Sequence, residues 1–162
     1  MIIISDTSVI SNLVQIERLE LLRHLFDVVV IPPAVLRELH QLESHEFVLT
    51  LTDWISVAQP GNHQLINELQ EILDPGESEA IALAVEGKAD FLLIDELKGR
   101  SVAKQYQVSI VGILGLLIQG KQRGILTAVR PEILKLREIG FRMSLGLMNE
   151  VLSKLNELPI EK

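Results

Sequence analysis

The chain has 162 residues, of which 48% are hydrophobic and 23% charged, and it contains no cysteine. This length and composition are typical of one globular domain and exclude a disordered chain, while the missing cysteines exclude a disulfide framework, a thiolate zinc site and a cysteine nucleophile. The net charge of −7 argues, as a total, against a nucleic-acid partner, because binding depends on neutralising phosphates. No apolar run approaches the ~18 residues that span a bilayer, and no basic N-terminal region suggests export, so we expect a cytoplasmic protein with no membrane contact.

Strands are predicted where short apolar runs stop at polar or turn residues. They cover residues 2–4, 28–31, 54–57, 91–94 and 108–111. Residues 2–4, 28–31 and 91–94 are apolar throughout, which is typical of parallel strands covered on both faces. The segment 108–111 is also expected to be a buried strand, whereas 54–57 is expected at a sheet edge.

Helices are predicted between the strands from the spacing of apolar residues. They cover about 9–26, 33–42, 65–73, 75–86, 96–105, 113–121, 128–138 and 145–155. Alternating helices and buried strands predict an α/β fold, a three-layer α/β/α domain with a central parallel sheet of four to five strands.

Two aspartates come just after predicted strands. Asp6 ends the first strand and Asp95 ends the fourth, and the carboxyl ends of parallel strands are where ligands bind. Each could instead be an ordinary helix N-cap, which stabilises by about 1 kcal/mol. Because two such carboxylates at one sheet edge repel each other, their pairing favours a bound cation.

Two glutamates on helices extend this acidic set. Glu38 lies on the partly apolar helix after Pro33, where a solvated glutamate is the simpler interpretation. In the helix after Asp74, Glu77 has a capping role available, whereas Glu79 lies on another face and has none. We therefore expect Glu79 to be the site residue of the two.

The four acids Asp6, Glu38, Glu79 and Asp95 predict a site for Mg²⁺ or Mn²⁺, which prefer oxygen ligands and promote phosphodiester hydrolysis. A phosphotransfer protein of the receiver or haloacid-dehalogenase type also has an aspartate after its first strand. It would need a second acid beside Asp6 or two residues later, where this chain has Thr7 and Ser8. A nucleic-acid-binding or regulatory module with a weakened site is the non-enzyme alternative.

Charge is segregated along the chain. Residues 1–97 carry 4 basic and 17 acidic side chains, whereas residues 98–142 carry 9 basic and 2 acidic ones. Lys98, Arg100 and Lys104 follow Asp95 on one predicted helix, so we expect them to bind RNA phosphates beside the metal site. The distribution of charge along the chain therefore favours a nucleic-acid partner, which the net charge alone disfavours.

The order of these motifs resembles the PIN domain, the fold of VapC-type toxin ribonucleases. The resemblance rests on Ile4-Ser5-Asp6-Thr7-Ser8, Val35-Leu36-Arg37-Glu38, Gly76-Glu77-Ser78-Glu79-Ala80, Leu93-Ile94-Asp95-Glu96 with Gly99-Arg100, and Val111-Gly112-Ile113-Leu114-Gly115. It implies that Asp6, Glu38, Glu79 and Asp95 are the catalytic and metal-binding acids, that Glu96 assists through water, and that Thr7, Ser8 and Asn12 are supporting polar residues.

The third acid is more often aspartate in the wider family, so the longer Glu79 is expected to reach the metal through water. The resemblance further implies a single domain over residues 1–162, a ribonuclease toxin of single-stranded RNA, a small antitoxin partner and a homodimer. The apolar stripe of residues 145–155, within the C-terminal segment 143–162, is expected to pack on the domain or on a partner.

Overall fold

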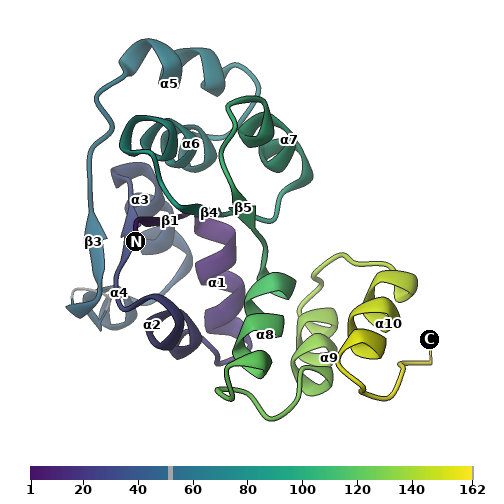
Figure 1. Ribbon diagram of the computed structural model, residues 1–162. Helices are drawn as coiled ribbons and strands as arrows, with labels where there is room; N and C mark the ends of the chain where they lie inside the picture. Colours follow the sequence, from purple (N-terminus) through teal and green to yellow (C-terminus); the bar gives the residue numbers. More distant parts are fainter. Residues whose placement is uncertain (51–52, 162) are drawn as a thin grey trace.

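The computed structural model describes residues 1–50 and 53–161, and within them five short strands form one all-parallel sheet (Figure 1). The strands are β1 (Ile3–Ser5), β2 (Val29–Ile31), β3 (Ile55–Val57), β4 (Phe91–Leu93) and β5 (Ile110–Val111). Their order is β3-β2-β1-β4-β5. The central strand is therefore β1, and β3 lies at an edge, as the sequence predicts.

Helices fill the connections between the strands. In the described residues they are α1 (Thr7–Gln15), α2 (Glu20–Phe26), α3 (Pro33–Leu42), α4 (His45–Thr50), α5 (His63–Gln70), α6 (Pro75–Gly87), α7 (Leu97–Gln105), α8 (Ile113–Gln122), α9 (Arg130–Glu138) and α10 (Leu145–Lys154). None of them is long and apolar enough to cross a membrane.

The helices form a layer on each face of the sheet (Figure 1). Successive residues of a strand point to opposite faces. Ile3 accordingly belongs to a buried cluster that contains residues of α1, α2 and α8, whereas Ile4 belongs to a second cluster with residues of α5, α6 and α7. The structure confirms the predicted three-layer α/β/α class.

The single helix predicted over residues 9–26 is wrong. The chain forms α1 and α2 instead, with a break at Glu17, whose φ of 60° is left-handed. The apolar spacing stays in phase across this break, so periodicity alone does not reveal it. The short helix α4 is an element that the sequence analysis missed.

The C-terminal helices pack beside α8, at the end of the molecule away from β3 (Figure 1). Met148, Val151 and Leu152 of α10 are buried in the cluster that contains Ile3. Leu145 and Leu147 of the same predicted stripe are exposed. The inward half of the stripe therefore packs on the chain's own core.

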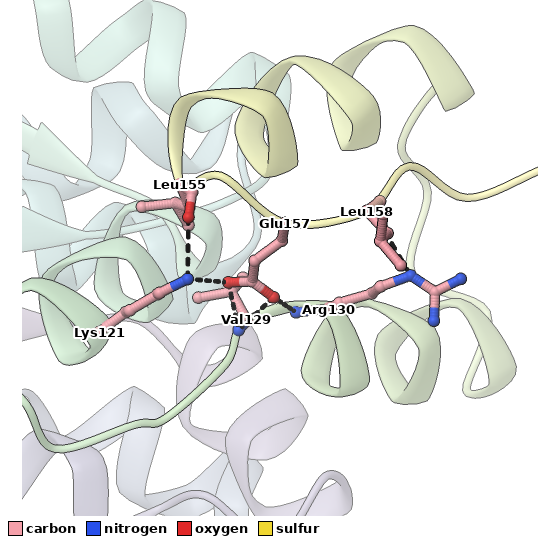
Figure 2. Close-up of polar contacts among 6 residues, drawn as sticks. All are labelled: Lys121, Val129, Arg130, Leu155, Glu157 and Leu158. Carbon is pink, nitrogen blue, oxygen red and sulfur yellow. Dashed lines mark hydrogen bonds and ion pairs between the residues drawn. The ribbon is translucent and has the colours of Figure 1, made fainter.

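One carboxylate fastens the turn after α10 (Figure 2). Glu157 accepts hydrogen bonds from Lys121 Nζ at 2.7 Å and from the N–H groups of Val129 and Arg130, each at 2.9 Å. Lys121 Nζ also donates to the Leu155 carbonyl. Burial raises the pKa of Glu157, but the hydrogen bonds from Lys121, Val129 and Arg130 lower it further, so that the pKa lies below its ordinary range. Glu157 thus joins the end of α8, the start of α9 and the C-terminal segment.

Candidate active site

The candidate site lies at the carboxyl ends of β1 and β4, which pair directly through Ser5 and Leu93. After β1 the chain adds β2 and then β3 on one side of this pair, and after β4 it adds β5 on the other side. Such a switch point is where open parallel sheets bind ligands, because the connecting helices diverge there. Asp6 and Asp95 follow these two strands, as the sequence predicts.

Asp6 is buried at the start of α1. Its Oδ1 accepts the Val9 N–H at 3.1 Å and its Oδ2 accepts the Ser8 hydroxyl at 3.0 Å. The carboxylate therefore is an N-cap, as the simpler interpretation expected, and also faces the pocket. Burial raises the pKa of Asp6 well above its usual range, and the neighbouring Asp95 and Glu77 raise it further against the hydrogen bonds that lower it.

Glu38 is held against the end of β1 by Thr7. Thr7 Oγ1 donates to Glu38 Oε1 at 2.7 Å. Burial raises the pKa of Glu38, the Thr7 hydroxyl lowers it, and Asp74 raises it again. Glu38 is thus a partly buried and oriented acid, which is unlike the solvated glutamate of the simpler interpretation.

Glu77 lies in the pocket, contrary to the preference for Glu79. Its own N–H is capped by Asp74 Oδ1 at 2.8 Å, which leaves its side chain free to enter the pocket. Its Oε2 is buried and has no hydrogen-bond partner. Burial and the neighbouring Asp74 raise the pKa of Glu77 from 4.5 to about 7.

Glu79 instead caps a different helix. Its Oε1 accepts the Ala34 N–H at 3.1 Å in the first turn of α3, and its Oε2 lies 3.7 Å from Arg37 Nη2. Pro32, at the N-cap of α3, makes no side-chain cap bond. Glu79 is absent from the residues that line the pocket. It therefore supplies the missing cap from α6, which is a tertiary role that inspection of its own helix cannot reveal.

Asp95 is fixed between two elements. Its Oδ1 accepts the Ile113 N–H at 2.9 Å, which caps α8 at a position where Gly112 has no side chain to do so. Its Oδ2 is buried without a hydrogen-bond partner. Burial raises the pKa of Asp95, and the Ile113 N–H and Arg100 lower it.

Arg100 is held inside the fold. Its Nη1 donates to the Ile94 carbonyl at 3.0 Å, and the side chain is half-buried beside Asp95. Lys98 and Lys104 are exposed on the same helix, α7. Of the three cations predicted to bind phosphate, the two lysines thus have free access to solvent, and Arg100 is committed to the carboxyl end of β4.

The pocket has a volume of about 250 Å³ and is strongly acidic. Its lining residues are Asp6, Thr7, Ser8, Ser11, Asn12, Glu38, Leu42, Asp74, Glu77 and Glu96. Five of these are carboxylic acids and none is basic. The predicted supporting residues Thr7, Ser8 and Asn12 and the predicted assisting acid Glu96 are all present. Sequence reasoning missed Asp74 and Ser11, although the cap sequence from Asp74 to Glu77 marked both acids for a structural role.

The donor set fits a hard divalent cation. Five carboxylic acids line the pocket and no basic side chain does. In addition, Glu77 Oε2 and Asp95 Oδ2 are buried and have no hydrogen-bond partner. Within residues 1–50 and 53–161, no three histidine, cysteine or acidic side chains are arranged to hold an ion together. Mg²⁺ commonly takes one or two carboxylates and keeps several waters, so it does not need such a trio.

Comparison with protein families identifies this architecture. A family model described as a PIN domain matches residues 2–157. The match spans nearly the whole chain, including both strand ends and all five acids of the pocket. No curated protein and no solved structure matches the chain significantly.

Proposed function

The chain belongs to the PIN-domain family, which has a nuclease-type fold, and on this premise we propose that it is a divalent-metal-dependent endoribonuclease that cleaves single-stranded RNA. The observation that carries the proposal is the pocket at the switch point, where five acids meet without a basic lining residue. Burial, and after it the neighbouring acids, raise the pKa values of Asp6 and Glu77, and a bound cation would favour the charged form of both groups.

The proposed ligands of Mg²⁺ or Mn²⁺ come from Asp6, Glu38 and Glu77, of which one or two bind the ion directly and the rest bind through water. Asp95 is oriented beside Asp6, and Glu96 acts through water. Glu77 replaces Glu79 in this set because Glu79 is occupied with the N-terminus of α3. When bound, the ion lowers the pKa of a water and stabilises negative charge on the phosphate.

The remaining residues orient these groups and the substrate. Thr7 fixes Glu38 by its hydrogen bond, and Ser8 fixes Asp6 in the same way. Asn12 lines the pocket and offers an amide to a water or a substrate hydroxyl. Lys98 and Lys104, exposed on α7, attract the RNA backbone, whose phosphates the acidic pocket alone would repel.

The proposed biological role is that of a toxin paired with a small antitoxin protein, acting as a homodimer. This part rests on the resemblance to VapC-type toxins. Expressing the chain alone should arrest bacterial growth in a manner that depends on Asp6, and co-expression of a small protein encoded beside it should relieve the arrest. Growth unaffected by high expression of the active chain would contradict the toxin role.

A catalytically weak PIN-like nucleic-acid-binding or regulatory module is the second candidate. This candidate is favoured because, among the described residues, no three histidine, cysteine or acidic side chains are arranged to hold a metal ion. Calorimetry separates the two, because the module predicts RNA binding without binding of Mg²⁺ or Mn²⁺ at millimolar concentration.

The direct test is cleavage of a single-stranded RNA by purified protein in Mg²⁺ or Mn²⁺. An Asp6→Asn variant is the matched control, since asparagine can still cap α1. We expect the wild type to cleave, and the variant or added EDTA to reduce the rate by about 100-fold or more. Cleavage that persists in the variant or in EDTA would contradict the proposal.

A further inference from the structure

Three glycines abut three different acids of the site. A Cβ atom built on Gly76 would lie 2.6 Å from both oxygens of Glu38. On Gly99 it would lie 2.6 Å from Glu77 Oε2, and on Gly112 it would lie 2.6 Å from Asp95 Oδ1. Real Cβ contacts essentially never fall below 3.0 Å, so in each case the carboxylate occupies the place of the missing side chain.

Backbone conformation does not explain these glycines. The glycines with φ in the left-handed region are Gly124 and Gly140, far along the chain from the pocket-lining segments. Gly76, Gly99 and Gly112 have backbone angles that other residues adopt, and Gly76 and Gly99 lie in helices, where alanine is favoured over glycine. At Gly76 the carboxylate of Glu38 excludes a side chain, and at Gly99 and Gly112 a carboxylate does so together with one further side chain.

The three glycines lie on three different connections of the fold. Gly76 is in the first turn of α6, Gly99 is in α7 and Gly112 precedes α8. Each therefore sets the depth at which an acid from another part of the chain can approach the carboxyl ends of β1 and β4. At Gly76 the backbone also contributes a hydrogen bond that favours the charged form of Glu38.

We propose that Gly76, Gly99 and Gly112 are positioning residues of the metal site. Gly76 and Gly99 provide the space that Glu38 and Glu77 need to reach the pocket, and Gly112 provides the space that Asp95 needs beside Asp6. The inference rests on the proposed function and deepens it. A methyl group at Gly76 or Gly99 displaces its acid, so that the ion loses a correctly placed oxygen, whereas a methyl group at Gly112 displaces Asp95 from its place beside Asp6.

Gly76 gives the cleanest separation of this role from a structural one. The three atoms nearest to a Cβ built there all belong to the carboxylate of Glu38, which is the end of a partly exposed side chain. Alanine there can be accommodated by rotation of Glu38 without disturbing the core. Gly99 also meets Ile94 Cδ1 at 2.7 Å and Gly112 meets Arg100 Nη1 at 2.5 Å, so alanine at these two positions disturbs further contacts.

The experiment compares Gly76→Ala, Gly99→Ala and Gly112→Ala with Gly87→Ala as control. A Cβ on Gly87, in the last turn of α6, meets nothing within 4 Å. For each protein we would measure the unfolding temperature, Mn²⁺ affinity by calorimetry, RNA cleavage and the crystal structure. We expect Gly76→Ala to keep an unfolding temperature within about 3 °C of wild type, to lose Mn²⁺ affinity by about tenfold or more, and to show Glu38 turned out of the pocket. Gly87→Ala should match wild type in Mn²⁺ affinity, RNA cleavage and site structure, and its unfolding temperature should be equal or slightly higher because alanine favours the helix.

The outcomes separate this inference from the function on which it rests. A folded Gly76→Ala protein with wild-type Mn²⁺ affinity, or with Glu38 in its original position, overturns the positioning role. If the wild type neither binds Mn²⁺ nor cleaves RNA, the proposed function fails, and the displacement of Glu38 in the crystal still decides whether the glycine holds space for that acid.

Discussion

Thr7 Oγ1 donates a 2.7 Å hydrogen bond to Glu38 Oε1, which joins the segment after β1 to α3. Thr7 is buried and is the neighbour of Asp6, so one contact sets the distance between two acids from separate parts of the chain. On sequence alone, Thr7 is a supporting residue only by resemblance to the PIN domain. The hydrogen bond provides the physical basis for that role.

Replacing Thr7 by valine tests this contact with almost no change in volume. We expect Thr7→Val to lower the free energy of unfolding by about 1 kcal/mol. We also expect it to lower the Mn²⁺ affinity by about tenfold, because Glu38 is no longer oriented. Thr7→Ser keeps the hydroxyl and should keep most of the affinity. Equal Mn²⁺ affinities for the valine and serine variants would show that the hydrogen bond does not orient the site.

The raised pKa of Glu77 predicts an unusual dependence of stability on pH. Its value rises from 4.5 to about 7 in the folded protein, so between these pH values the folded state binds more protons than the unfolded state. The stability that Glu77 contributes is therefore fully present below about pH 4.5 and is lost as the pH rises through about 7. Asp6, Glu38 and Asp95 shift in the same direction.

Urea unfolding of the metal-free protein between pH 5 and pH 8 measures this effect. We expect the midpoint to fall across that interval in wild type, to fall less in Glu77→Gln, and to recover at pH 8 when Mn²⁺ is added. A wild-type midpoint that rises steadily toward pH 8 without metal would contradict the pKa assigned to Glu77.

The two exposed lysines of α7 predict how RNA binding depends on salt. Each lysine that neutralises one phosphate of a single strand adds about 0.7 to the slope of log affinity against log salt concentration. We expect Lys98→Gln and Lys104→Gln each to weaken RNA binding and to reduce that slope. Lys88→Gln, which removes an exposed lysine at the far end of α6, is the matched control and should leave the slope unchanged. Identical slopes for all three variants would exclude α7 as the phosphate contact.

The contacts of Glu157 predict a stability effect outside the pocket. Glu157→Ala removes the acceptor for Lys121 and for the first N–H groups of α9 (Figure 2), so we expect a loss of about 2 kcal/mol in unfolding free energy. Glu150→Ala is the control, because Glu150 forms only an exposed pair with Lys154 and should change stability by about 0.5 kcal/mol or less. Chemical denaturation of both variants gives the comparison, and similar losses would mean that Glu157 does not fasten the C-terminal segment.

The local sequence pattern predicted the strands of the sheet correctly. It failed for features that depend on contacts between distant parts of the chain. The buried strands end at polar residues, so Asp6 and Asp95 could be placed correctly from the sequence. The break at Glu17 could not, because the apolar spacing continues across it. The sheet order that makes β1 and β4 neighbours also had to be inferred, since no local signal fixes it.

The choice between Glu77 and Glu79 shows the same limit within the site. Glu77 carries a capping signal that points away from function, yet only its N–H takes part in the cap and its side chain enters the pocket. Glu79 has no role on its own helix, yet it caps α3 across the interface between the two helices. Caps supplied by another element do not appear in the local sequence.

The most direct test of the account is the Mn²⁺ affinity of Glu77→Gln and Glu79→Gln, measured by calorimetry at pH 8. Both changes remove one charge, and glutamine at position 79 can still accept the Ala34 N–H. We predict that Glu77→Gln loses Mn²⁺ affinity by about tenfold or more, whereas Glu79→Gln binds as wild type does. Loss of affinity in Glu79→Gln with wild-type binding in Glu77→Gln would contradict the account.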